Sequence, residues 1–399
     1  MSDQAKKSAF YDFISRYVDT DFETYMAQST LSKDYINWHG YCLPYVYGDG
    51  QKEYEAVRGG CALFDATPVK KYRIRGADAG AFMDYLCTRS ISKLPEMRAT
   101  YAIWCNEDGA LNDDSMLYKL AEDDYLLMVA DVDHDEHFAR CMKGLKDVVI
   151  TEETPSLAGL SVQGPKSCAV LNSFGFAGVE NLRPFDVVNY DLAGGEVMVA
   201  RVGFTADLGY EIWFKPALCG AIEQAFTAAE EAVGVQIAGY GLAAIQICRM
   251  EGGMIVPSWD TAQTFVDPEL ERSPFELAMP WNVDLDREDD FVGKAALIKE
   301  RAEGSRYAMT GFEIEDKCDL ADGADLFSSI NGKDVNVGTL PSVSWSYGLG
   351  RWIGLASLKT AHADLAEGFV EIGGKKVACR IRELPFVKFD RRTQVPAPM

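Results

Sequence analysis

Positive charge is scarce in this 399-residue chain, in which 39 Lys and Arg residues stand against 61 Asp and Glu residues, giving a formal net charge of −22. A field of that sign repels phosphate groups, so nucleic acid and anionic membrane surfaces are excluded as partners. An anionic small molecule would have to be met by a local cluster of Arg or Lys, because the overall field opposes its binding.

Histidine is also rare, with only His39, His134, His137 and His362 in the whole chain. His134 and His137 lie in DVDHDEHF, which predicts a solvated helix start. No ligand cluster accompanies them, so no metal site is predicted. P-loop, GxGxxG and serine-triad patterns are missing as well. Catalysis is therefore expected to depend on carboxylates and a bound cofactor.

The ten cysteines include no CxxC pair, and the first residues, MSDQAKKSAF, lack the apolar core of a secretory leader. No run reaches the ~18 to 20 apolar residues that a membrane span requires. We expect a cytoplasmic protein with reduced thiols and no membrane partner. A chain of 399 residues exceeds what one hydrophobic core holds, which favours two or three domains.

Strand and helix patterns alternate along the first three hundred residues without a strict βαβ rhythm. Strands are predicted over 70–76, 125–130, 196–204 and 209–214, and an amphipathic helix over 219–234. From about residue 301, short strand-like pieces separated by Gly, Asn and Asp turns predict a β-rich end domain.

Several separated stretches carry the most specific information. In order they are YEAVRGGCALFDATPVKKYRIRG at 54–76, NEDGALNDD at 106–114, LSVQGPKS at 160–167, RVGFTADLGYEIWF at 201–214, and CRMEGGMIVPSWD at 248–260. In this order and spacing they resemble the T-protein of the glycine cleavage system and its folate-dependent relatives. The resemblance runs from about residue 38 to residue 391.

The resemblance implies an α+β fold of three domains around a central hole that binds tetrahydrofolate as co-substrate. Its first domain would comprise residues 1–63 and 155–255, its second 64–154 and 256–300, and its third, a β-barrel, 301–399. The first two domains would thus exchange segments along the chain.

The resemblance also implies four folate-contacting residues. Glu211 matches the pterin-binding glutamate, whose carboxylate accepts two N–H donors in a fork; the alternative is a half-exposed strand glutamate. Phe204 stands where the family usually has Tyr and would pack on the pterin. Arg249 would either bind folate, brace Glu251 or form an internal ion pair. Tyr101 would either line the cavity or pack in the core.

Asp113 matches the first aspartate of the family's DD pair and is the predicted catalytic residue. A carboxylate near folate N5 can orient the pterin, stabilise developing positive charge or relay a proton. In an extended segment Asp114 would point to the opposite face and have a structural role. The alternative for Asp113 is a turn aspartate that caps local amides.

Two departures from the T-protein pattern bear on the reaction. Asn112 replaces an apolar residue before the aspartates, and MVADVDHD at 128–135 replaces a "vNAsn" segment. Both are similar to the folate-dependent demethylases, and YINWHG at 35–40 is similar to a segment of the aromatic O-demethylases. Asn112 and the hairpin residues Trp38, His39 and Tyr41 are therefore candidate donor-binding residues.

Three functions follow as hypotheses. The first is a tetrahydrofolate-dependent demethylase that moves a methyl group from a small S-, O- or N-methylated metabolite to N5 of tetrahydrofolate. The second is the aminomethyltransferase of glycine cleavage, whose partner is a lipoyl carrier protein. The third is a non-catalytic folate-binding protein, which the sequence supports least because the KGCYxGQ motif of such relatives is missing.

Overall fold

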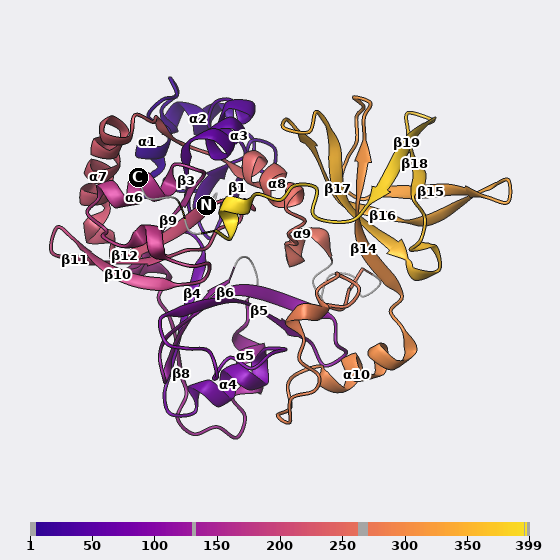
Figure 1. Cartoon of the computed structure of the whole chain (residues 1–399), viewed down its shortest axis with the longest axis horizontal. Helices are drawn as coiled ribbons and strands as arrows, with labels where there is room; N and C mark the ends of the chain where they lie inside the picture. The colour runs from indigo at the N-terminus through magenta and orange to yellow at the C-terminus, as the bar shows by residue number, and fades with distance from the viewer. Residues whose placement is uncertain (1–4, 130–132, 262–269, 395, 397–399) are drawn as a thin grey trace.

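The computed structural model describes residues 5–129, 133–261, 270–394 and 396. Two β-sheets covered by helices and one separate closed barrel make up the molecule (Figure 1). This mixture of helices and sheets, with the C-terminal barrel, confirms the predicted α+β class. Within the described ranges, no helix has the length and apolar character needed to cross a membrane.

The first sheet has six strands in the order β10-β11-β12-β9-β3-β13. Their bounds are β3 Cys61–Asp65, β9 Ala158–Gln163, β10 Val187–Leu192, β11 Gly195–Ala200, β12 Gly209–Phe214 and β13 Ile237–Gly239. Neighbouring strands are antiparallel except for β3 and β13. The strand predicted over 196–204 ends at Ala200, because the residues after it leave the sheet and line the cavity described below.

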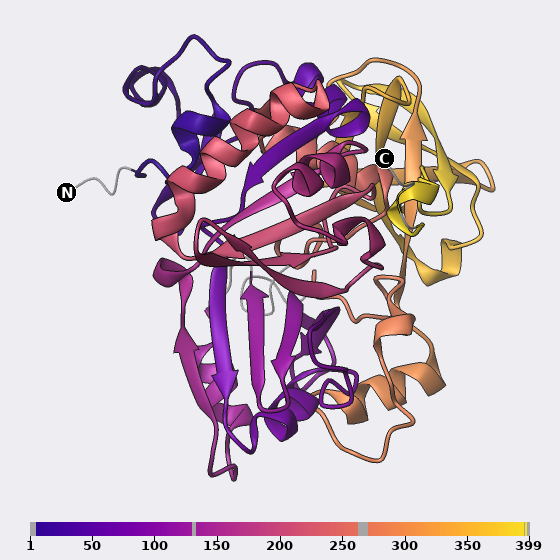
Figure 2. The same cartoon turned by 60° about the vertical axis from the view of Figure 1, so that its left-hand side comes forward.

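Helices α6 (Ser167–Ser173) and α7 (Cys219–Val233) cover the outer face of this sheet (Figure 2). Helix α7 buries Ile222, Phe226 and Ala229, spaced four and then three residues apart along one stripe. It ends at Gly234, whose φ of 66° is the left-handed conformation that glycine adopts without strain.

The second sheet has five antiparallel strands in the order β5-β6-β7-β4-β8. Their bounds are β4 Lys70–Arg75, β5 Arg98–Cys105, β6 Leu111–Ala121, β7 Asp124–Val129 and β8 Val149–Glu152. Helices α4 (Ala79–Leu86) and α5 (Asp135–Cys141) pack on its outer face through a core that contains Leu117. Its inner face meets the first sheet.

Alternation along β6 decides which side chains reach that inner face. Met116 and Tyr118 belong to the core between the two sheets, together with Trp213 of β12, whereas Leu117 belongs to the core under α4 and α5. Within the first sheet, the Trp213 ring lies over Gly159, its partner on the neighbouring strand β9, where an added Cβ would lie 2.1 Å from two atoms of the ring.

The barrel closes because β14 pairs with both β17 and β19. Its strands are β14 Tyr307–Ile314, β15 Ala324–Ile330, β16 Lys333–Ser346, β17 Arg351–Lys359, β18 Glu367–Ile372 and β19 Lys375–Arg382. Helix α10 (Lys294–Glu303) precedes it, close to the predicted change of character near residue 301. The finer domain boundaries stay a prediction.

The remaining elements connect or flank these parts. They are α1 Tyr11–Ile14, α2 Phe22–Gln28, β1 Tyr35–Trp38, β2 Tyr41–Pro44, α3 Gly50–Gly59, α8 Leu242–Glu251 and α9 Pro257–Asp260. Helix α8 packs against α3 and contacts β16 and β17, so it joins the first sheet to the barrel.

Candidate active site

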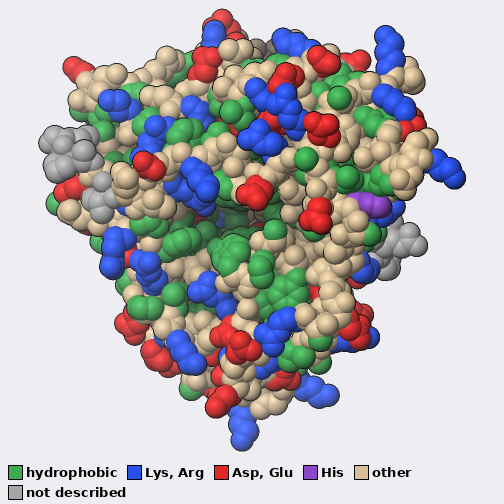
Figure 3. Space-filling model, turned by 45° about the vertical axis from the view of Figure 1, so that its right-hand side comes forward, with side chains coloured by type: hydrophobic (Ala, Val, Ile, Leu, Met, Phe, Trp, Pro, Cys, Tyr) green, Lys and Arg blue, Asp and Glu red, His purple; other side chains and the backbone are tan. Residues whose placement is uncertain are grey.

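A cavity of about 520 Å³ lies where the two sheets and the chain after the barrel meet. Its described lining is residues 101, 116, 184–185, 201–204, 207, 209, 252–255, 277–279, 281, 384–385 and 392–393. The molecule is hollowed near the middle of one face, and hydrophobic side chains gather around the hollow (Figure 3). The size is within the roughly 300 to 1,000 Å³ usual for small-molecule sites.

Glu211 projects from β12 into the region between the two sheets. The Tyr118 hydroxyl, fully buried on β6, donates a hydrogen bond of 2.8 Å to Glu211 Oε2. Burial raises the pKa of Glu211, while this hydrogen bond opposes the rise. Gly209, two residues earlier on the same face of β12, lines the cavity. The geometry therefore places an oriented carboxylate close to the cavity, where the sequence predicted a pterin acceptor.

Tyr101 of β5 lies in the cavity lining, and its hydroxyl donates a 2.6 Å hydrogen bond to Asp114 Oδ2. Burial, followed by the charges of Asp114, Asp113 and Asp260, raises the pKa of Tyr101 well above its ordinary value. The phenol therefore keeps its proton and uses it in the bond to Asp114.

The expectation that Asp113 turns into the cavity and Asp114 away from it is wrong. Asp113 is 2% exposed, and its Oδ2 lies 2.7 Å from Nε2 of His134, on the helix-covered side of the sheet. Burial lowers the pKa of His134 to about 4, so the neutral ring donates its Nε2–H to the carboxylate. Asp113 Oδ1 accepts the backbone N–H of Asp114 at 2.8 Å.

His134 and His137 are buried, not solvated as predicted. The His134 ring stacks on Phe138 with a centroid distance of 5.2 Å and meets Trp104 edge-on at 5.0 Å. The helix does begin directly after His134, as the sequence indicated. His134, at the N-cap of α5, and His137, within the helix, therefore both carry their imidazoles into the core.

Asn112 is at an irregularity in the sheet. Trp104 pairs with Asp113, but Cys105 pairs with Leu111, so Asn112 is an extra residue on β6, in a β-bulge. It is 7% exposed. Bulges re-aim side chains and are frequent beside active sites. Of the second departure, MVADVDHD at 128–135, residues 130–132 lie outside the described residues.

Arg249 is fully buried and engaged inside the protein. Its Nη1 and Nη2 reach the two carboxylate oxygens of Asp260 at 2.7 and 3.0 Å, and Nη1 also donates to the Met254 carbonyl at 2.9 Å. Of the three alternatives for Arg249, the structure shows the internal ion pair. Its partner is Asp260 of α9, and the ion pair joins α8 to α9.

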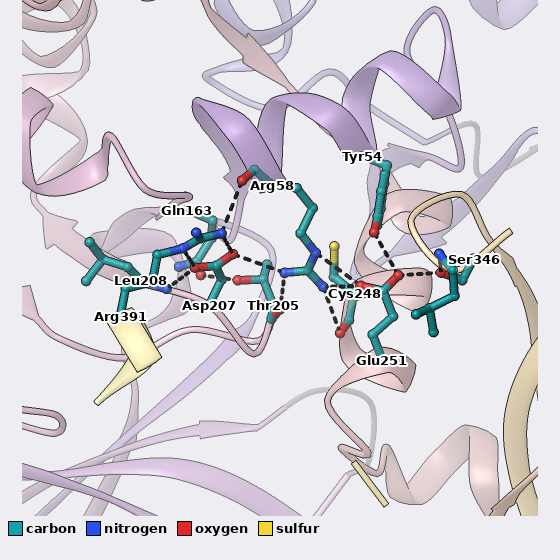
Figure 4. A network of polar contacts seen from close by, with 11 residues as sticks. Tyr54, Arg58, Gln163, Thr205, Asp207, Leu208, Cys248, Glu251, Ser346 and Arg391 are labelled. Carbon is teal, nitrogen blue, oxygen red and sulfur yellow. Dashed lines mark hydrogen bonds and ion pairs between the residues drawn. The ribbon is translucent and has the colours of Figure 1, made fainter. Parts of the chain in front are cut away.

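Glu251 is braced instead by Arg58, whose Nη2 lies 2.6 Å from Oε2 (Figure 4). The hydroxyls of Tyr54 and Ser346 donate to Oε1 at 2.8 and 2.5 Å. These bonds tie α3, α8 and the end of β16 together, so the Arg249–Glu251 segment of α8 supports the fold around the cavity.

The same network fastens the chain after the barrel. Arg391 pairs through Nε and Nη2 with the carboxylate of Asp207, which is also 3.4 Å from Arg58 Nη1 (Figure 4). Arg201 donates from Nη2 to the carbonyls of Arg391, Arg392 and Gln394. The C-terminal segment is therefore held as a wall of the cavity.

Arg201 and Arg392 both line the cavity and supply the local positive charge that the acidic composition called for. The Arg201 Nε–H is buried and has no hydrogen-bond partner within the described residues. Neither arginine was predicted, because they are 191 positions apart in the sequence and only the fold brings them together. Trp281, 64% exposed at the cavity, was also missed, because nothing in AMPWNVD indicates that its ring reaches the cavity.

The remaining predicted residues divide between the cavity and the periphery. Phe204 lines the cavity. Trp38 packs on Phe64 at 6.2 Å, and His39 is the first residue of a two-residue hairpin turn, with φ of 50° and Nδ1 2.8 Å from the Pro68 carbonyl. Tyr41 lies under the Lys6 amine. The three hairpin residues are not in the described cavity lining, so their donor-binding role stays a prediction.

No group of three or more His, Cys, Asp or Glu residues suited to a metal ion is found among residues with described positions.

Comparisons with known proteins match nearly all of the chain. A family model described as the GCVT N-terminal domain matches residues 25–287, and one described as the glycine cleavage T-protein C-terminal barrel domain matches residues 308–388. An aminomethyltransferase of Clostridium botulinum (strain Okra / Type B1) is 31% identical over 90% of this chain and 92% of its own length.

A further relative is an aminomethyltransferase of Exiguobacterium sibiricum, 29% identical over 88% of this chain and 93% of its own. Among solved structures, the glycine cleavage system aminomethyltransferase T from Bartonella henselae superposes with a TM-score of 0.79 over 96% of this chain and 98% of its own, at 22% identity. That likeness shows the shared fold.

Proposed function

The chain belongs to the glycine cleavage T-protein family, a family of folate-dependent enzymes with tetrahydrofolate as co-substrate, and we propose that it moves a one-carbon unit from an organic donor to tetrahydrofolate held in the central cavity. The observation that carries this proposal is the cavity itself, which has an oriented glutamate near one part of its lining and two arginines at another.

The residues present fit tetrahydrofolate. Glu211, held by Tyr118, would accept the paired N–H donors of the pterin edge in the fork that carboxylates form. Phe204 would pack against the ring. Arg201, with its unpartnered buried Nε–H, and Arg392 would face the carboxylates of the glutamate tail. When bound, tetrahydrofolate supplies the N5 nucleophile that accepts the one-carbon unit.

The two carboxylates of β6 would have different roles, Asp114 at the cavity surface and Asp113 behind it. Asp114 accepts the Tyr101 hydroxyl at the cavity surface, and Asp113 holds the backbone N–H of Asp114. We assign Asp114 and Tyr101 to charge stabilisation at the reacting centre, and Asp113, with His134, to positioning. The resemblance alone assigned the chemistry to Asp113.

Aminomethyl transfer is the first candidate reaction, because the relatives described above are named aminomethyltransferases. The donor would then be an aminomethyl group on the lipoyl arm of a carrier protein. Ammonia, 5,10-methylenetetrahydrofolate and the reduced lipoyl arm would be the products.

Methyl transfer from a small methylated metabolite is the second candidate. Asn112 favours it, because this residue replaces the apolar residue of T-proteins and is the buried extra residue of a β-bulge beside the aspartates. The product would be 5-methyltetrahydrofolate, and a general acid would be required only for an ether donor, whose leaving oxygen needs a proton.

One experiment separates the candidates. Full-length protein is incubated with tetrahydrofolate and either aminomethyl-lipoyl carrier protein or a panel of sulfonium, ammonium and aryl ether methyl donors. Chromatography of the folate products distinguishes 5,10-methylene- from 5-methyltetrahydrofolate. Absence of both products with every donor, in protein shown to bind tetrahydrofolate, would refute one-carbon transfer.

A further inference from the structure

We propose that the cavity wall formed by Tyr101 and Trp281, with Asp114 hydrogen-bonded to Tyr101 behind it, binds the one-carbon donor through a positively charged group, such as a sulfonium or a substituted ammonium. The inference rests on the proposed one-carbon transfer and adds the chemical class of the donor. It excludes neutral aryl ethers as the preferred donors.

The first argument is the arrangement of the aromatic rings. The ring centroids of Tyr101 and Trp281 are 6.1 Å apart with an interplanar angle of 31°, and both side chains line the cavity. Trp281 is 64% exposed, an unusual state for the largest apolar side chain. A tryptophan face open to a cavity is the preferred surface for an organic cation.

The second argument is the charge behind the rings. Asp114 Oδ2 lies 2.6 Å from the Tyr101 hydroxyl oxygen. Asp113 and Asp260 add to the negative electrostatic potential at this hydroxyl. Of these carboxylates, Asp260 is paired with the Arg249 guanidinium, and Asp114 is the one in direct contact with the Tyr101 hydroxyl. Because the Tyr101 proton is directed at Asp114, its oxygen lone pairs and ring remain for a ligand that is positive or a hydrogen-bond donor.

The third argument is the rigidity of this wall. Asn282, fully buried next to Trp281, donates from Nδ2 to the Tyr101 carbonyl at 3.2 Å, and its own carbonyl accepts the Thr88 hydroxyl at 2.6 Å. The turn Pro280–Asn282 is thereby pinned to β5. The backbone segments that carry the two rings are therefore linked before a ligand arrives, which lowers the entropy cost of binding.

The fourth argument is the separation of charge across the cavity. Arg201 and Arg392 are the cationic side chains of the described lining, and they come from the first sheet and the C-terminal segment rather than from the Tyr101 wall. An anionic folate tail and a cationic donor can therefore occupy one cavity without competing for the same groups.

The test uses a charged and a neutral probe of the same shape. Choline and 3,3-dimethylbutan-1-ol are titrated into the full-length protein by calorimetry, without folate. We expect choline to bind at least tenfold more tightly. Trp281→Leu should reduce this ratio to about threefold or less, and Asp114→Asn should reduce it several-fold while leaving 3,3-dimethylbutan-1-ol binding unchanged. Tyr85→Leu, which removes an exposed ring on α4, is the matched control and should keep the wild-type ratio.

Equal binding of the two probes to wild-type protein would overturn the inference, as would a ratio unaffected by Trp281→Leu. Faster turnover with aryl methyl ethers than with any cationic donor would also overturn it, while leaving one-carbon transfer intact. Conversely, selective choline binding by a protein that yields no folate product with any donor would refute the proposed function and keep the cation site.

Discussion

Removal of Arg249 should destabilise the fold rather than abolish folate binding. The guanidinium is 1% exposed and forms a bidentate pair with Asp260, which is fully buried, and a further bond to the Met254 carbonyl. After Arg249→Met, the partners left to the Asp260 carboxylate among the described residues would be the Val256 N–H and the Ser342 hydroxyl. Breaking a buried ion pair by deleting one partner costs about 3 to 5 kcal/mol.

The double variant Arg249→Met/Asp260→Leu tests the cause. It removes both charges, and replacement of a whole buried pair by apolar residues is often nearly neutral. Loss of the remaining hydrogen bonds should cost about 1 to 2 kcal/mol. The double variant should therefore be more stable than Arg249→Met by about 2 kcal/mol, which is the sign of direct coupling between the two sites.

Urea unfolding of the wild type, both single variants and the double variant gives these free energies from midpoints at constant slope. Tetrahydrofolate affinity, measured by calorimetry on the folded fraction, should change less than threefold in the double variant. If Arg249→Met keeps the wild-type midpoint and loses folate binding, Arg249 is a ligand-binding residue and the structural assignment is wrong.

Three further outcomes are expected. Asp114→Asn should lower kcat at least tenfold with little change in unfolding free energy. Asp113→Asn leaves one acceptor oxygen for the two donors that the carboxylate serves, His134 Nε2–H and the Asp114 N–H, and should cost about 1 to 3 kcal/mol of stability. Equal effects on both measures would contradict the roles given to the two residues. Asp207→Asn should weaken the ion pair with Arg391 and raise the Kd for tetrahydrofolate. Increased proteolysis after residue 383 is a second measurement. An unchanged Kd and unchanged proteolysis would count against the C-terminal segment as a wall of the cavity. Lys71 is fully buried, and burial lowers its pKa to about 7. Between pH 7 and the ordinary lysine pKa near 10.5, the folded state therefore binds fewer protons than the unfolded state. The free energy of unfolding should rise with pH through that window, because the cost of burying this amine falls. Lys71→Met should remove this rise in unfolding free energy between pH 7 and pH 9.5, and a wild-type slope in the variant would show that other groups cause it.

The outcome at the aspartate pair shows the limit of reading a strand from its sequence. Alternation correctly predicted that Asp113 and Asp114 point to opposite faces. Which face meets the cavity depends on where α4 and α5 pack, and those helices cover the side to which Asp113 points. The bulge at Asn112 changes the count of residues along β6, and nothing in GALNDD signals it.

Predictions from local sequence patterns agree best with the structure where one contiguous segment contains the whole pattern. The strand over 209–214, the helix that begins at residue 219 and the β-rich end domain agree with the structure, because periodicity and turn residues are properties of contiguous chain. Arg249 shows the opposite case, since its partner Asp260 could not be chosen from several nearby acidic residues without the fold.

The sequence by itself determined the family, the mixed α+β class, the tetrahydrofolate co-substrate and the need for local cations, since ordered motifs and total charge are visible in one dimension. Only the tertiary structure brought Arg201 next to Arg392, Tyr101 next to Trp281, and Asp114 behind the Tyr101 hydroxyl. Arg201 and Arg392, for example, are 191 positions apart. An active site is defined by distances across a cavity, and this cavity closes only when the sheets and the C-terminal segment pack together.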